Sequence, residues 1–158
     1  YEPYLDGGMK KSKEIKMIKH NYYDVISMFH SLEHVYDIDK CLKSISDYLK
    51  DKGILVISIP NHDAYERKFF NDNWIAYDVP RHLYHFTFES VERILNKNKF
   101  KIIDHKPIYI DTFYNVLMSS NSRVNFLKIP YLILISLLNV YINSKLASSI
   151  MVVCQKYD

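Results

Sequence analysis

Histidines are concentrated in two short segments of this chain. Residues 30–34 read His-Ser-Leu-Glu-His, and residues 80–86 read Pro-Arg-His-Leu-Tyr-His-Phe. An imidazole has an ordinary pKa of about 6.5, so it can take up or release a proton near neutral pH. These two segments are therefore where acid–base chemistry is expected.

The second segment is predicted to line a substrate pocket. Its four polar side chains fall within five residues and are those of Arg81, His82, Tyr84 and His85. That density is too high for a buried strand, and Pro80 restricts the backbone where the segment begins. We take His82 or His85 as the candidate general base and Arg81 as the candidate partner of an anionic substrate group. The alternative is that His82 and His85 only tie down a loop.

The first segment also has the HxxEH spacing of inverted zinc proteases. That chemistry requires both histidines on one face of a helix, with the glutamate as general base. His30 directly follows an apolar run of strand character, so the helical context is missing and proteolysis is not expected. We expect no tightly bound metal at His30, Glu33 and His34, because a nitrogen-rich set does not suit magnesium. Glu33 and His34 are instead expected to fix the loop.

The elements around the first segment are predicted to form a βαβ unit. Residues 24–29 are an apolar run of strand length, and residues 54–59 are an almost continuous apolar run that stops at a proline. Between them, apolar residues at three- and four-residue steps predict an amphipathic helix capped by Asp37. Ligands bind at the carboxyl ends of parallel strands, so residues 30–34 and 60–63 are expected to border one crevice.

Further elements are predicted in the second half of the chain. Thr87 is placed to cap another helix. Residues 101–105 together with 108–110 predict a strand that Pro107 interrupts, and residues 149–155 predict a last strand.

Residues 126–142 are rich in Leu, Ile and Tyr but are broken by polar residues. The segment is marginal for the roughly 20 apolar residues that a bilayer span needs, so a buried or lid-like helix is expected. A peripheral membrane contact through this segment is the alternative.

Composition and charge narrow the class of protein. The chain has 158 residues, of which 48% are hydrophobic and 25% are charged, as in one ordinary globular domain. Twenty-one basic against 18 acidic residues give a net charge of +3, which is too small an excess for a nucleic-acid binder. Two cysteines provide neither a disulfide framework nor a CxxC metal site. A reducing cytoplasm is the expected location.

Two blocks of the sequence carry a resemblance to a known family. Residues 22–61 read YYDVISMFHSLEHVYDIDKCLKSISDYLKDKGILVISIPN, and W...D.PRHLYHFTFESVERILNKNKF follows at residues 74–100. In this order they resemble class I S-adenosylmethionine-dependent methyltransferases. The resemblance implies an α/β, Rossmann-like sheet of seven strands, with residues 24–29 as the fourth strand and 54–59 as the fifth. This chain is then the C-terminal half, with parallel strands, an antiparallel last strand and helices on both faces.

The resemblance implies S-adenosylmethionine as the cofactor, lying across the carboxyl ends of the strands. It implies that Glu2 holds both ribose hydroxyls and that Phe29, His30 and Ser31 border the cofactor. Family members also use a GxGxG turn after their first strand, because only glycine lets the backbone pass so close to the ligand. This chain has three glycines and no such turn.

We therefore expect residues 1–158 to be a single, partial methyltransferase domain that begins after the cofactor turn. Residues 113–147 are expected to be an apolar helical insertion or lid. The strand at 24–29 would then lack its neighbour in the family, so self-association through the exposed sheet edge is expected.

The function implied by the resemblance is methyl transfer to a small-molecule acceptor, by this chain or by a longer enzyme of which it is the substrate-facing part. Family members with the PRHLYHF block are often found with cell-surface sugar and quinone chemistry. The alternative is a catalytically inactive methyltransferase-like interaction module, which the missing glycine turn favours.

Overall fold

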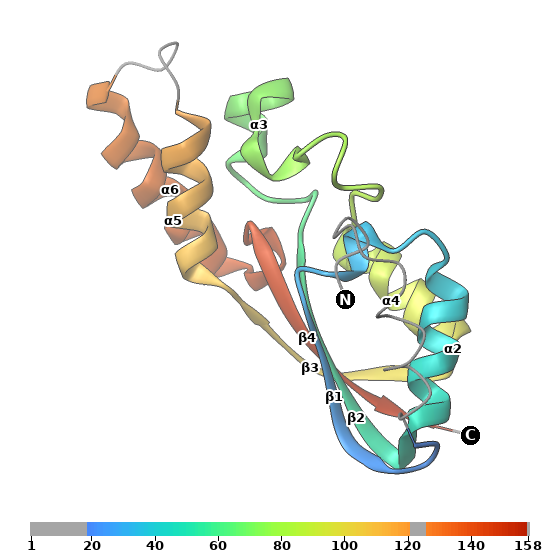
Figure 1. The fold of residues 1–158 in the computed structure, drawn as a ribbon. Helices are drawn as coiled ribbons and strands as arrows, with labels where there is room; N and C mark the ends of the chain where they lie inside the picture. Colours follow the sequence, from blue (N-terminus) through green and yellow to red (C-terminus); the bar gives the residue numbers. More distant parts are fainter. Residues whose placement is uncertain (1–18, 121–125, 158) are drawn as a thin grey trace.

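The fold is a mixed sheet with helices packed around it (Figure 1). The structure is a computed structural model that describes residues 19–120 and 126–157. Within these residues the strands are β1 (Tyr23–Phe29), β2 (Leu49–Pro60), β3 (Phe100–Pro107) and β4 (Ser149–Lys156). The α-helices are α2 (Ile38–Tyr48), α3 (Arg67–Phe70), α4 (Phe88–Lys97), α5 (Tyr109–Ser119) and α6 (Ile129–Ile142). Short 3-10 helices are η1 (Leu32–His34), η2 (Asn71–Asn73), η3 (Ile75–Tyr77), η4 (Phe126–Lys128) and η5 (Ser144–Leu146).

The order of the strands in the sheet is β1-β2-β4-β3. β1 and β2 are parallel, whereas β4 is antiparallel to both β2 and β3. These pairings confirm the predicted fold class, in which parallel strands are joined by an antiparallel last strand. β2 begins earlier than predicted, because the chain is already extended at Leu49, directly after α2.

One apolar core joins the sheet to α2 and α4, which lie together on one side of it (Figure 1). Leu55, Ile57 and Ile59 alternate along β2 and are almost completely buried. Leu42 of α2 and Leu95 of α4 are fully buried against the same core. The helical spacing in the sequence therefore corresponds to the buried faces of α2 and α4, and the continuous apolar run supplies the buried residues of β2.

Side chains cap both helices as predicted. The Asp37 carboxylate accepts a hydrogen bond from the backbone N–H of Lys40 at 2.9 Å. The Thr87 hydroxyl accepts from the N–H of Ser90 at 3.1 Å, and the Ser90 hydroxyl accepts from the N–H of Thr87 at 2.9 Å. This reciprocal capping box fixes where α4 begins.

A second apolar cluster lies beyond the carboxyl ends of β1 and β2. There α5 and α6 pack together, with α3 nearby (Figure 1). The buried side chains of this cluster include Phe70, Trp74, Val116, Ile129 and Leu132. The cluster holds the loop that follows β2 and the start of α5 at the same end of the sheet.

The prediction that residues 108–110 continue the third strand is wrong. β3 ends at Pro107, which has no N–H with which to extend a strand pairing. The N–H of Ile108 donates to the carbonyl of Ser149 at 3.0 Å, and Tyr109 is the first residue of α5. The apolar residues in this stretch therefore belong to a helix.

The helix predicted within residues 126–142 is present as α6, but it is not buried on all sides. Leu132 and Val140 face the protein, whereas Leu134, Leu138 and Tyr141 are each more than half exposed. A fully buried helix is therefore excluded, and the lid-like role and the limits 113–147 remain predictions. Within the described residues, no helix combines the length and the hydropathy needed to cross a bilayer.

The long loop after β2 begins and ends at neighbouring positions beside the end of this strand. Asn61 and Phe86 form an isolated parallel bridge, and the N–H of His62 donates to the carbonyl of Phe86 at 2.7 Å. We call residues 62–85 the excursion. It contains α3, η2, η3 and most of the second histidine segment.

Candidate functional site

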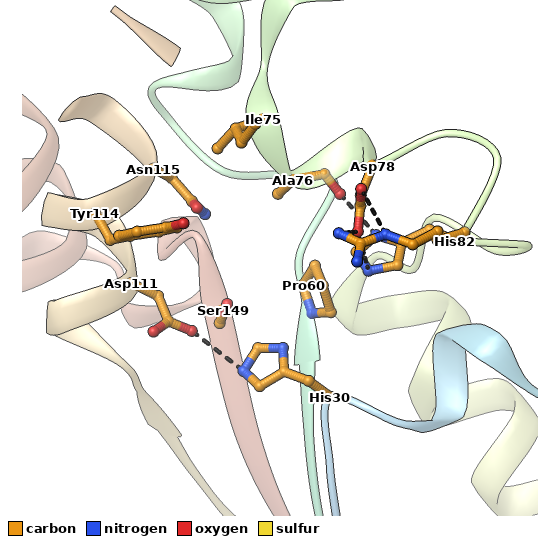
Figure 2. A pocket seen from close by; sticks show the side chains of 11 residues that line it. His30, Pro60, Ile75, Ala76, Asp78, His82, Asp111, Tyr114, Asn115 and Ser149 are labelled. Atoms are coloured by element: carbon orange, nitrogen blue, oxygen red, sulfur yellow. Dashed lines mark hydrogen bonds and ion pairs between the residues drawn. The ribbon is translucent and has the colours of Figure 1, made fainter. Parts of the chain in front are cut away.

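A cavity of about 290 Å³ lies at the carboxyl ends of β1 and β2 (Figure 2). Its lining comes from the residues that follow β1, the end of β2, the excursion, α5 and the start of β4. The side chains are those of His30, Pro60, Ile75, Ala76, Asp78, Arg81, His82, Asp111, Tyr114, Asn115 and Ser149. Both histidine segments contribute to it, so the crevice predicted at this edge of the sheet exists.

His30 is the first residue after β1 and has a left-handed backbone, with φ of 44°. This turn directs its ring into the cavity, where Figure 2 shows it facing Asp111. Nε2 of His30 lies 3.3 Å from Oδ2 of Asp111, and Nδ1 lies 3.6 Å from Oε1 of Glu33. The carboxylates of Asp111 and Glu33 raise the pKa of His30 to about 9. The ring is therefore an imidazolium at neutral pH and gives the cavity a positive charge.

Glu33 and His34 connect the two histidine segments. The carbonyl of Glu33 accepts from the N–H of Leu83 at 2.9 Å. Nδ1 of His34 lies 2.8 Å from the carbonyl of Arg81, to which it donates. The backbone of Glu33 and the ring of His34 therefore tie residues 33–34 to the excursion, and the loop-fixing role of the Glu33 side chain stays a prediction.

His82 lies in the wall of the cavity with a side chain only 10% exposed. Its Nδ1 donates to the carbonyl of Ala76 at 2.9 Å, so in the neutral ring Nε2 carries the lone pair. Burial lowers the pKa of His82, which keeps the ring neutral at pH 7. This is the form in which an imidazole accepts a proton.

Arg81 is bound to Asp78 through two contacts. Its Nη2 lies 2.6 Å from Oδ2 of Asp78, and its Nε donates to Oδ1 at 3.1 Å. The guanidinium is about 70% exposed and borders the cavity, so it can also meet a ligand.

His85 differs from its neighbours because it lies outside the lining of this cavity. Nε2 of His85 is 3.0 Å from the carbonyl of Tyr77, and its ring stacks on that of His62. Tyr84 donates its hydroxyl to the carbonyl of Tyr36 at 3.0 Å. These contacts hold the excursion in place and favour the loop-tying alternative for His85.

Three of the four residues predicted to contact the cofactor lie together at the end of β1. Glu2 lies outside the described residues. Phe29 and Ser31 flank His30 at the end of β1, where the Ser31 hydroxyl donates to the carbonyl of Phe29 at 2.8 Å. The ring of Phe29 is more than half exposed, so a ligand at this edge can cover it.

The sequence reasoning missed the part of the site that comes from α5. Asp111, Tyr114 and Asn115 line the cavity from the first two turns of this helix. Burial acts against ionisation of Asp111, but the contacts with His30 and Ser149 together outweigh it and lower the pKa of Asp111. The spacing of these three residues at one helical face was the available signal, and reading 108–110 as a strand concealed it.

Comparison with known proteins identifies the family. A family model described as a methyltransferase domain matches residues 5–105. No curated protein matches the chain.

Solved structures show the same fold at low sequence identity. A methyltransferase dependent on S-adenosylmethionine from Thermotoga maritima has a TM-score of 0.57 at 13% identity, covering 89% of this chain and 59% of its own. One from Archaeoglobus fulgidus has a TM-score of 0.53 at 17% identity, covering 91% and 64%. A Haemonchus contortus phosphoethanolamine N-methyltransferase 2, in complex with S-adenosylmethionine, has a TM-score of 0.53 at 14% identity, covering 89% and 35%.

This chain thus spans between about a third and two thirds of the length of these proteins. The family match covers more than half of the chain, and the fold agrees with it. The chain belongs to the methyltransferase domain family.

Proposed function

We propose that this chain is the substrate-facing part of an S-adenosylmethionine-dependent methyltransferase that acts on a small molecule. The observation that carries the proposal is the charged cavity at the carboxyl edge of the sheet, in a chain of the methyltransferase domain family. In open α/β sheets this edge is where ligands bind.

The described residues fit such a cofactor. S-adenosylmethionine has an aromatic base, a cationic sulfur and a zwitterionic amino-acid end. The exposed ring of Phe29 suits the base or the cation, and the cavity contains both carboxylates and an imidazolium. Phe29, His30 and Ser31 would hold the cofactor at this edge, with Glu2 as a further proposed contact. When bound, the cofactor supplies a methyl group on a positively charged sulfur.

The remaining cavity residues act on the acceptor. Nε2 of neutral His82 is available to take the proton that an oxygen or nitrogen acceptor must lose. Arg81 and the imidazolium of His30 favour an acceptor with an anionic group. Most of the gain in rate comes from holding the acceptor in line with the methyl group. A sugar-related or quinone-related acceptor is included in this proposal, and the cytoplasm is the proposed location.

Cofactor binding tests the proposal. We expect calorimetry to show weak or no binding of S-adenosylmethionine by residues 1–158, because the sequence has no GxGxG turn. A version extended by the residues encoded upstream of Tyr1 should bind it and transfer a radiolabelled methyl group to a small acceptor. Micromolar binding by residues 1–158 would contradict the need for the glycine turn. Absence of binding by both versions would contradict the methyltransferase function.

The second candidate is an inactive methyltransferase-like interaction module. The outer face of α6 supports it, because Leu134, Leu138 and Tyr141 expose apolar surface that a partner can cover. An extended version that binds no cofactor but forms a stable complex with another protein would favour this second function. The same apolar face supports the alternative of a peripheral membrane contact, which flotation with liposomes tests.

A further inference from the structure

Glu33, His34 and His82 converge behind the wall of the cavity. One side-chain atom from each of them lies within 4.8 Å of the other two. We propose that these three side chains bind one divalent metal ion of the zinc class. The earlier expectation of no metal treated His30 as the first ligand, whereas in the structure His82 completes the group and His30 contacts Asp111.

The carboxylate of Glu33 points to a cation. The side chain is fully buried, and neither of its oxygens has a hydrogen-bond partner among the described residues. The nearest nitrogens, Nδ1 of His30 and Nε2 of His82, lie at 3.6 and 3.9 Å, which is beyond hydrogen-bond length. The imidazolium of His30 at 3.6 Å compensates part of this charge, but a buried carboxylate whose two oxygens make no hydrogen bond is still unfavourable. A metal ion between Glu33 and His82 would satisfy it.

The two histidines are oriented as metal ligands. His34 and His82 each donate Nδ1–H to a backbone carbonyl, those of Arg81 and Ala76, at 2.8 and 2.9 Å. In the neutral rings this leaves the Nε2 lone pairs without a proton. An imidazole that binds a metal through one nitrogen almost always donates the other N–H in this way. Both rings therefore have the supporting contacts of a metal site before any ion binds.

The ligand types select the ion. Two imidazole nitrogens with one carboxylate suit zinc and its neighbours in the first transition row, whereas magnesium prefers an oxygen shell. Zinc bonds of about 2.0–2.1 Å in a tetrahedron place ligand atoms about 3.3 Å apart, so side-chain rotations that close the widest separation of 4.8 Å by about 1.5 Å suffice. Three protein ligands leave one position for water or a ligand.

Metal binding and proton transfer would use the same atom. A zinc ion on Nε2 of His82 takes the lone pair that the proposed function assigns to the acceptor's proton. The two roles exclude each other, so the proposed proton transfer belongs to the metal-free protein. The metal site itself does not depend on methyl transfer, and it is tested without any activity measurement.

The experiment uses residues 1–158 after treatment with a chelator. Titration with Co²⁺ should give the intense visible bands of a four-coordinate ion, and Zn²⁺ should displace them at one equivalent. His34→Gln should weaken Zn²⁺ binding at least tenfold, since it removes one of three ligands at a partly exposed position. Glu33→Gln should act in the same way, and circular dichroism checks that it folds. His20→Gln, an exposed histidine before β1, is the matched control and should bind as the wild type does.

Two results would overturn the metal site. The first is the absence of stoichiometric Zn²⁺ or Co²⁺ binding by the folded wild type. The second is an affinity that His34→Gln leaves unchanged, or that His20→Gln lowers as much. Because neither readout involves S-adenosylmethionine, failure here is distinguishable from failure of the proposed function.

Discussion

His82 donates Nδ1–H to the carbonyl of Ala76, lines the cavity and has a side chain that is only 10% exposed. In the proposed function its Nε2 takes the proton that the acceptor loses. Its effect should therefore appear in the rate of reaction and not in cofactor binding.

In the extended, metal-free enzyme, His82→Ala should lower kcat by about 10²–10⁴-fold, the usual contribution of a general base. The affinity for S-adenosylmethionine should stay within a few-fold, because the lost interaction is made in the transition state. Steady-state kinetics and calorimetry measure the two quantities. The control variant His20→Gln should change neither quantity. Full turnover by His82→Ala would contradict the role of His82 as general base and would leave it a structural role through its bond to Ala76.

Glu66 is a second buried carboxylate, and it lies within the excursion, directly before α3. One oxygen accepts hydrogen bonds from Trp74 at 3.3 Å and from the Ser148 hydroxyl, while the other has no partner among the described residues. Burial raises the pKa of Glu66 above its ordinary value. The folded protein therefore binds this proton more tightly than the unfolded chain, and it loses stability as the pH rises through the raised pKa.

Glu66→Gln should raise the free energy of unfolding at pH 8 by about 1–2 kcal/mol, because a neutral amide removes the buried charge. At pH 4 the difference should shrink, since the wild-type carboxyl is protonated there. Urea denaturation at the two pH values measures this. Glu92→Gln, at an exposed position of α4, is the control. A Glu66→Gln variant that is less stable at pH 8 would show that the charge itself is needed.

At the scale of an element, α4 depends on its capping box. Thr87→Ala removes the side-chain acceptor for the N–H of Ser90 and should lower the free energy of unfolding by about 1 kcal/mol. Thr87→Ser keeps the hydroxyl and should retain most of the stability. Chemical denaturation monitored by circular dichroism compares the two variants. Equal losses would show that the methyl group of Thr87 matters more than its cap.

The elements that sequence predicted correctly are those with one buried face. The apolar run of β2 and the helical spacing that includes Leu42 in α2 both arise because these side chains pack in the core. Ile108 and Ile110 show no periodicity that distinguishes a strand from a helix, because two apolar residues beside a proline fit a strand end or a helix start equally well. Reading them as a strand also removed Asp111 from the candidate site.

The candidate site was predictable only in part. The sequence indicated that His30 and the segment around His82 would lie at one edge, because both follow strands. It did not indicate that His34 and His82 would meet, with ring centroids 4.9 Å apart. That contact depends on the path of the excursion, which local patterns do not specify.

At the scale of the whole molecule, the two edges of the sheet differ. β3 has Lys101, Asp104 and Lys106 along it and ends in a proline, features that discourage pairing with another strand. β1 pairs only with β2 among the described residues, and its Val25 and Phe29 are more than half exposed. We propose that copies of this chain associate through the open edge of β1.

Val25→Lys should shift the protein toward the monomer in sedimentation velocity runs over a range of concentrations. A charge on an edge strand opposes pairing with a second edge. Ile103→Lys makes the same change on β3, where the residue is similarly exposed, and should leave the association unchanged. A wild-type protein that is monomeric at all concentrations would contradict the proposed contact.

The bridge between Asn61 and Phe86 brings the two ends of the excursion together. Closing a flexible loop costs only about 0.6 kcal/mol more for each doubling of its length. The sheet and α4 are therefore nearly indifferent to how many residues lie between these two points. Loop closure therefore sets little limit on the length of the segment that carries Arg81 and His82, and the proposed acceptor site can change with that segment while the strands and α4 stay the same.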